Sequence, residues 1–168
     1  MARPRLSDGA VRTAFYFDLF SPEAYLAAER IVALLPTAEW IPVCAPALPG
    51  ADLLDGFRCA TDREAFFDRI ERLAARRGLQ DVRWPDPFPS DTAYAMLVAT
   101  YARQIGRCVA FSLAAFRQAF AGGRDLGVPD NVLIAAAACE MHPNAVIKGA
   151  GLRSVARALD EATALAAR

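Results

Sequence analysis

The fold is decided by the stretch Phe15-Tyr16-Phe17-Asp18-Leu19-Phe20-Ser21-Pro22-Glu23-Ala24-Tyr25-Leu26. An apolar and aromatic run ends at an aspartate, a serine-proline pair follows, and a helical pattern begins at once. Proline is tolerated in the first turn of a helix, because the N–H that it lacks would have no helical partner there. The order predicts a buried strand, a tight turn and a helix whose N-terminus lies at Ser21. The free N–H groups and partial positive charge of such an end favour an anion.

The composition is that of one folded domain with no general affinity for polyanions. Of the 168 residues, 55% are hydrophobic and 23% charged, and the formal net charge is zero. A neutral chain has no general attraction to nucleic acid or anionic membranes. No window of about 18 residues is strongly apolar throughout, and the N-terminus lacks the apolar region of a secretory signal. We therefore expect a cytoplasmic protein with no nucleic-acid or membrane partner, whose residues 1–12 form a flexible leader.

The cysteines suggest neither a metal site nor a redox site. Their spacing matches no zinc-binding pattern and no closely spaced redox pair. We expect free thiols and no metal. The four positions are Cys44, Cys59, Cys108 and Cys139.

The pattern along the chain is strand, helix, strand, and then helices. We expect a strand over 14–19, a helix from Pro22 that ends before Pro36, and a second strand over 40–44, which together form a parallel crossover. Later helices are expected to begin near Thr61 (in a capping-box pattern with Glu64), Ser90 or Asp91, Cys108, Asp130, Pro143 and Leu152, with a break at Gly149-Ala150-Gly151.

Four ordered stretches carry a family resemblance over roughly residues 14–168. They are the opening stretch, Trp84-Pro85-Asp86-Pro87-Phe88-Pro89, Ala114-Ala115-Phe116-Arg117-Gln118-Ala119-Phe120 with Gly123-Arg124-Asp125-Leu126, and Arg157-Ala158-Leu159 through Thr163. In this order they resemble the 2-hydroxychromene-2-carboxylate isomerases and kappa-class glutathione transferases, which belong to the DsbA-like thioredoxin superfamily.

The resemblance implies an α/β, thioredoxin-like (DsbA-like) fold. Residues 13–60 would form the N-terminal βαβ unit, 61–150 a large all-helical insertion, and 151–168 the helix that returns to the thioredoxin core. Family members continue with a Gly-Val-Pro-Thr-like segment whose cis proline lines the glutathione site, and then two strands and a helix. We expect this C-terminal ββα part to be missing here, so the family's contacts to the glutathione backbone have no counterpart to carry over.

The resemblance also implies glutathione as cofactor, a small aromatic substrate and a homodimer. Ser21 would be the catalytic residue that donates to the glutathione thiolate, and Ser21 and Pro22 would bind the cofactor. A free thiol has a pKa near ~8.5, which a hydroxyl donor and a helix N-terminus can lower. The thiolate could then add to an unsaturated ketone and leave again, as in the cis-trans isomerisation of an aromatic-degradation intermediate such as 2-hydroxychromene-2-carboxylate. A substrate pocket would be lined by Phe20, Tyr25, Trp84 and Phe88.

Three alternatives stay open. Ser21 could be an ordinary helix cap with no chemistry. A DsbA-like redox protein would need a reactive cysteine at this turn, where the sequence has Ser21 and Ala24. A DsbA-like protein without redox cysteines could be a non-catalytic binding or self-associating module. Glu23 would add unfavourable negative charge beside a thiolate, and His142 is interpreted as part of a turn at a helix end.

Overall fold

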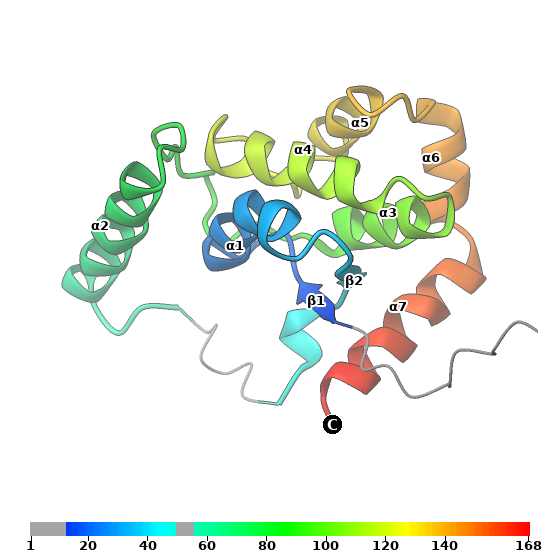
Figure 1. The fold of residues 1–168 in the computed structure, drawn as a ribbon, viewed down its shortest axis with the longest axis horizontal. Coiled ribbons are helices and arrows are strands. Elements are labelled where there is room, and N and C mark those ends of the chain that lie inside the picture. The colour runs from blue at the N-terminus through cyan, green and yellow to red at the C-terminus, as the bar shows by residue number, and fades with distance from the viewer. Residues whose placement is uncertain (1–12, 50–55) are drawn as a thin grey trace, which may run out of the picture.

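The computed structural model describes residues 13–49 and 56–168. Its elements are β1 (Ala14–Phe17), α1 (Pro22–Leu34), β2 (Glu39–Pro42), the 3-10 turn η1 (Ala45–Ala47), α2 (Ala60–Arg76), α3 (Ala93–Gln104), α4 (Cys108–Phe120), α5 (Pro129–Ala137), α6 (Pro143–Ala150) and α7 (Arg153–Ala166). Figure 1 shows their arrangement. The predicted leader 1–12 lies outside the described residues, as does part of the segment before α2. None of the helices in the two ranges is long and apolar enough to cross a bilayer.

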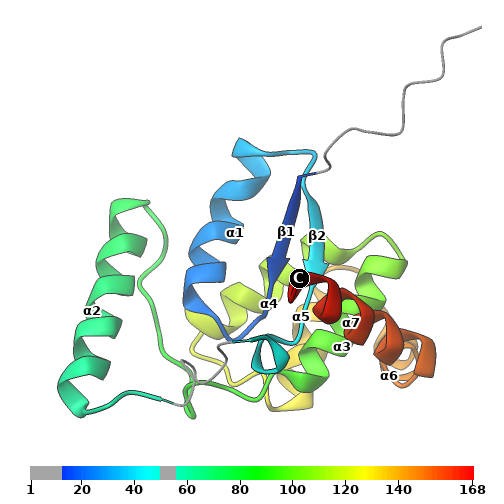
Figure 2. The same cartoon turned by 90° about the horizontal axis from the view of Figure 1, so that it is seen from below.

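The two strands form the predicted parallel crossover. β1 pairs with β2 in parallel, from Ala14 opposite Glu39 to Phe17 opposite Pro42, and α1 connects them. Figure 2 shows the two strands side by side, pointing the same way, with α1 alongside β1. β1 ends at Phe17, two residues earlier than predicted, because the chain turns over Leu19 and Phe20.

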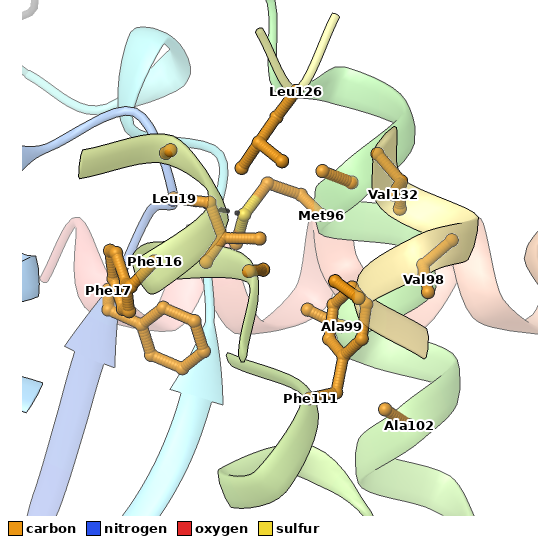
Figure 3. Packing of buried hydrophobic residues seen from close by; sticks show 14 of the residues in the cluster. Phe17, Leu19, Met96, Val98, Ala99, Ala102, Phe111, Phe116, Leu126 and Val132 are labelled. Atoms are coloured by element: carbon orange, nitrogen blue, oxygen red, sulfur yellow. Dashed lines mark hydrogen bonds between the residues drawn. The ribbon is translucent and has the colours of Figure 1, made fainter. Parts of the chain in front are cut away.

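Helix α3 lies at the centre of the helical part and packs against α4, α5, α6, α7 and β2. Three of its buried positions are small residues, Ala95, Ala99 and Ala102, none of which is exposed. Small side chains on α3 leave room for larger side chains of the neighbouring helices, which fill the space against it. Figure 3 shows Ala99 and Ala102 on α3 near Phe111 of α4.

The core joins this helical part to the strands. The ring of Phe17 on β1 lies 5.8 Å from that of Phe116 on α4 and 5.6 Å from that of Trp40 on β2. The N–H of Leu19 donates to Sδ of Met96 over 3.4 Å, the contact drawn in Figure 3. The strand unit and the helices therefore share one hydrophobic core.

Several predicted helix starts differ from the structure by one or two residues. Helix α2 begins at Ala60 without a side-chain cap, so Thr61 lies inside its first turn and the predicted capping box is wrong. Thr92 occupies the N-cap position of α3 without a side-chain capping bond, and Asp91, one of the two predicted caps, accepts from the N–H of Ala93 over 3.0 Å. Helix α5 begins at Pro129, whose ring presets the helical φ, so Asp130 lies in its first turn instead of capping it.

The break predicted at Gly149-Ala150-Gly151 falls at Gly151, whereas Gly149 is a helical residue in close contact with Tyr101. Helix α6 runs to Ala150 and Gly151 follows as its C-cap. A Cβ on Gly149 would lie 2.4 to 2.6 Å from three ring atoms of Tyr101 on α3. The missing side chain is therefore what lets Tyr101 pack directly against the backbone of α6.

We predict that Gly149→Ala destabilises the protein by about 1–3 kcal/mol, because the added methyl overlaps the Tyr101 ring and forces α3 and α6 apart. Gly151→Ala is the matched control: its Cβ would meet nothing closer than 3.5 Å and its φ is negative. Urea unfolding of both variants measures the difference. Equal stability of G149A and G151A would contradict this role of Gly149.

Candidate functional site

Ser21 caps the N-terminus of α1, as the sequence predicted. Its backbone is extended, at φ −84° and ψ 116°, and its Oγ accepts a hydrogen bond from the N–H of Ala24 over 3.1 Å. Pro22 follows at the first helical position and is buried. The side chain of Ser21 is half-buried at the point where β1 gives way to the helix. The sequence places this hydroxyl because serine and proline each have a preferred position at a helix start.

Asp18 holds the turn before Ser21 in place. Its side chain is 4% exposed. Oδ1 accepts from the Thr92 hydroxyl over 2.7 Å and from the N–H of Phe20 over 3.3 Å, and Oδ2 accepts from the N–H of Ala45 over 3.0 Å. Burial raises the pKa of this carboxyl above 3.8, while these hydrogen bonds act in the opposite direction. Asp18 therefore both forms the turn and ties it to two distant segments.

The end of β2 is held in a similar way by α7. The N–H of Cys44 donates to Oγ1 of Thr163 over 2.9 Å, and this hydroxyl in turn donates to the carbonyl of Leu159. Burial raises the pKa of the Cys44 thiol, and the negative charges of Asp18, Asp160 and Asp91 raise it further. This end of the sheet thus carries several carboxylates.

A chain of polar contacts leads from Ser21 to helix α2. The Ser21 hydroxyl donates to Oε2 of Glu23 over 3.4 Å, a long hydrogen bond. Oε1 of Glu23 accepts from Nη2 of Arg69 over 2.9 Å. The guanidinium carbon of Arg69 lies 5.2 Å from the centre of the Phe66 ring, within cation–π range. The side chains of Ser21, Glu23 and Arg69 are partly exposed.

Beyond Arg69 lies an aromatic cluster, which comprises Phe57, Phe66, Phe67, Trp84 and Phe88. The rings of Phe67 and Trp84 stack 3.8 Å apart at 9°, and Trp84 and Phe88 meet edge to face at 5.0 Å. Nε1 of Trp84 donates to Glu71 on α2 over 2.8 Å. All five rings are half-buried. The structure thus brings the predicted Trp84 and Phe88 together. Their cluster is linked to Glu23 through Arg69, which contacts both Phe66 and Glu23.

The α2 members of this cluster, Phe66 and Phe67, are not among the site residues predicted from the sequence. Phe66 and Ile70 follow the spacing of a buried helix face, and Ile70 is indeed unexposed. The available signal was the pairing of Arg63 and Arg69 with these rings at helical spacing; Arg63 lies 4.9 Å from the centre of Phe67.

The remaining candidates lie in other surroundings. Phe20 is half-buried in the turn itself. Tyr25 is 2% exposed and its ring stacks 5.5 Å from Phe120, so it is a core residue instead of a wall of an open pocket. His142 is exposed and caps α6 by accepting from the N–H of Asn144. Across residues 13–49 and 56–168, no cluster of three His, Cys, Asp or Glu side chains is arranged to hold a metal ion.

Comparisons with known proteins identify the fold. No protein-family model matches the sequence, and no curated protein matches it. Among solved structures, that of a selenomethionine-substituted 2-hydroxychromene-2-carboxylate isomerase is similar, with a TM-score of 0.75 at 15% identity. The match covers 92% of this chain and 78% of the isomerase chain. The chain therefore has the DsbA-like, thioredoxin-type α/β fold of that isomerase, which confirms the fold class expected from the sequence.

We predict that Thr92→Val destabilises the protein by about 1–3 kcal/mol, because the buried Asp18 carboxylate loses its shortest hydrogen bond. Thr100→Val is the matched control, since Thr100 is also buried but donates to the carbonyl of Met96 one turn earlier in the same helix. That carbonyl keeps its helical partner, so a smaller loss is expected. Thermal unfolding compares the variants, and a control that is equally destabilised would contradict the role assigned to Thr92.

The raised pKa of Asp18 predicts a pH dependence. Its folded pKa lies above 3.8, so the folded state holds this proton more tightly than the unfolded state. The contribution of Asp18 to stability is therefore complete below about pH 3.8 and falls as the pH rises through the folded pKa. The variant Asp18→Asn lacks this titrating group and therefore serves as the reference.

We expect the stability of the wild type, relative to that of D18N, to decline as the pH rises from below 3.8 through the folded pKa of Asp18. Urea unfolding in a pH series starting below 3.8 measures both proteins. A relative stability that stays constant or increases with pH would contradict the prediction.

Proposed function

We propose that this protein binds a thiolate at Ser21 and acts as a glutathione-dependent isomerase on a small aromatic compound. The observation that carries the proposal is the Ser21 hydroxyl at the N-terminus of α1, at the end of the turn that follows β1. It is supported by the fold shared with a 2-hydroxychromene-2-carboxylate isomerase. The reaction that we propose is the cis-trans isomerisation of an aromatic-degradation intermediate such as 2-hydroxychromene-2-carboxylate.

The hydrogen bonds of Ser21 fit a thiolate. One lone pair of Oγ is taken by the N–H of Ala24 at 3.1 Å, which fixes the rotation of the side chain. Its proton has the Glu23 carboxylate as acceptor at 3.4 Å, which is long for an O–H···O bond. The hydroxyl can therefore redirect its proton to a sulfur anion without losing its role as a cap. The partial positive charge of the helix end acts in the same direction.

The chain would act on the thiol by stabilising its anion. Glutathione would supply a nucleophile that adds to an unsaturated substrate and leaves again. Each unit by which the Ser21 site lowers the thiol pKa corresponds to about 1.4 kcal/mol of preference for the anion. Asp18 keeps the turn rigid, and the half-buried rings of the aromatic cluster offer a face on which a planar substrate can stack.

Three of the protein's four thiols favour an external nucleophile over dithiol redox chemistry. The four cysteines are free. Reactive thiols need a lowered pKa. Burial instead raises the pKa of Cys44 and Cys139, and that of Cys108 to about 11. These three thiols are therefore poor nucleophiles at neutral pH.

We predict that Ser21→Ala weakens glutathione binding roughly tenfold, because a hydrogen bond to a charged acceptor is lost. It also lowers stability by about 1 kcal/mol through the lost helix cap. Ser21→Asp separates the two effects, since its carboxylate caps the helix but repels an anion. Calorimetric titration with glutathione, together with ultraviolet absorbance of the thiolate, measures binding and ionisation.

We expect S21D to unfold like the wild type and to bind glutathione no better than S21A. Ser154→Ala, which changes an exposed serine on α7, is the control and should bind like the wild type. Failure of the wild type to bind glutathione at millimolar concentrations, or full binding by S21A and S21D, would overturn the proposal.

A further inference from the structure

We propose that Arg69 is a positioning residue that compensates the charge of Glu23 and thereby sets how readily a thiol at the Ser21 position ionises. This inference rests on the proposed function, because it concerns the electrostatics of the same site. It assigns a role to helix α2, which is distant in sequence from the turn. It also accounts for a carboxylate beside a site that should hold an anion.

Glu23 is placed where it opposes a thiolate. Its Oε2 lies 3.4 Å from the Ser21 Oγ and accepts the proton that a thiolate would accept. A sulfur bound by Ser21 would therefore lie next to this carboxylate. Two like charges at such a distance disfavour ionisation by roughly half a pKa unit or more, even in water.

The surroundings add further negative charge. Asp18 lies directly behind the turn, 4% exposed. Asp91 and Asp160 act, with Asp18, on the Cys44 thiol at the same end of the strands. A site for an anion at this end of the sheet needs a compensating cation, and Arg69 provides one on the side of Glu23.

Arg69 is held in position instead of being a free surface cation. Its Nη2 donates to Oε1 of Glu23 over 2.9 Å, and its guanidinium lies against the ring of Phe66. Helix α2 is itself attached to α1, since Nη1 of Arg77 donates to the carbonyl of Leu26 over 2.7 Å. Ile70, next to Arg69, is fully buried.

The geometry also limits the size of the effect. The side chains of Arg69 and Glu23 are 51% and 48% exposed. Salt screens such a pair, so the compensation should weaken as ionic strength rises. Because Glu23 is bound through Oε1, its other oxygen stays beside Ser21, and removing Arg69 leaves an uncompensated carboxylate there.

The test uses Ser21→Cys, which places a thiol at the site without any glutathione. The pKa of this thiol is obtained from the pH dependence of its alkylation by iodoacetamide, followed by peptide mass spectrometry so that the four native cysteines are resolved. In this background, R69Q should raise the thiol pKa by roughly half a unit, a threefold loss of thiolate, and E23Q should lower it. In the E23Q background Arg69 loses the carboxylate that holds it beside the site, so adding R69Q should have a smaller effect than it has alone.

Arg72→Gln is the matched control. Arg72 lies on the same helix, is exposed, and pairs with Asp68 at 3.8 Å instead of with Glu23. R72Q should leave the thiol pKa unchanged, and melting temperatures check that all variants fold. Equal shifts in R69Q and R72Q, or an effect of R69Q that is the same with and without Glu23, would overturn the inference.

The failure of this inference can be told apart from that of the proposed function. The alkylation series contains no glutathione and reports on the Glu23–Arg69 pair alone. If the series shows the expected coupling but the wild type binds no glutathione, the proposed function is overturned and the electrostatic role of Arg69 is supported. If glutathione binds but the series shows no coupling, Arg69 has no such role.

Discussion

The buried carboxylate of Asp18 is the interaction on which the rest of the site depends. It accepts hydrogen bonds from its own turn, from Ala45 after β2 and from Thr92 before α3. Burying a carboxylate costs free energy unless its oxygens accept hydrogen bonds. Separating any of the three segments from Asp18 would leave one of its oxygens short of a donor, so the carboxylate holds the segments together. The turn that presents Ser21 is therefore fixed by residues from both strands' ends and from the helical part.

Helix α2 is attached to the molecule in a different way. Of its residues, Ile70 and Ala74 are buried. Its further contacts include the stacking of Phe67 on Trp84, the bond from Trp84 to Glu71 and that from Arg69 to Glu23. Figures 1 and 2 show it standing at one side of the molecule, next to α1. The attachment of the aromatic cluster therefore depends on stacking and ion pairing, whereas the Ser21 turn depends on burial.

Local patterns predicted the elements that local forces control. The apolar run before Asp18, the Ser21-Pro22 pair and the apolar spacing after it were sufficient for β1, the helix cap and α1. Two of the differences from the predicted boundaries involve a side chain with a distant partner. Thr92 occupies the N-cap position of α3 while its hydroxyl donates to Asp18, 74 residues away in sequence. The predicted helix break falls at Gly151, whereas Gly149 lies inside helix α6 with Tyr101 packed against it.

The sequence by itself determined the parallel crossover, the place of the Ser21 hydroxyl and, through ordered motifs, the fold that the comparison confirms. The crossover and the place of Ser21 follow from periodicity and from the backbone preferences of serine and proline, which act within a few residues, whereas the fold class was implied by the family resemblance of the ordered motifs. Only the tertiary structure placed Arg69 beside Glu23 and assembled the aromatic cluster from α2 and the loop before α3. Both depend on how helix α2 packs, and packing between residues 46 positions apart leaves no periodic trace in the chain.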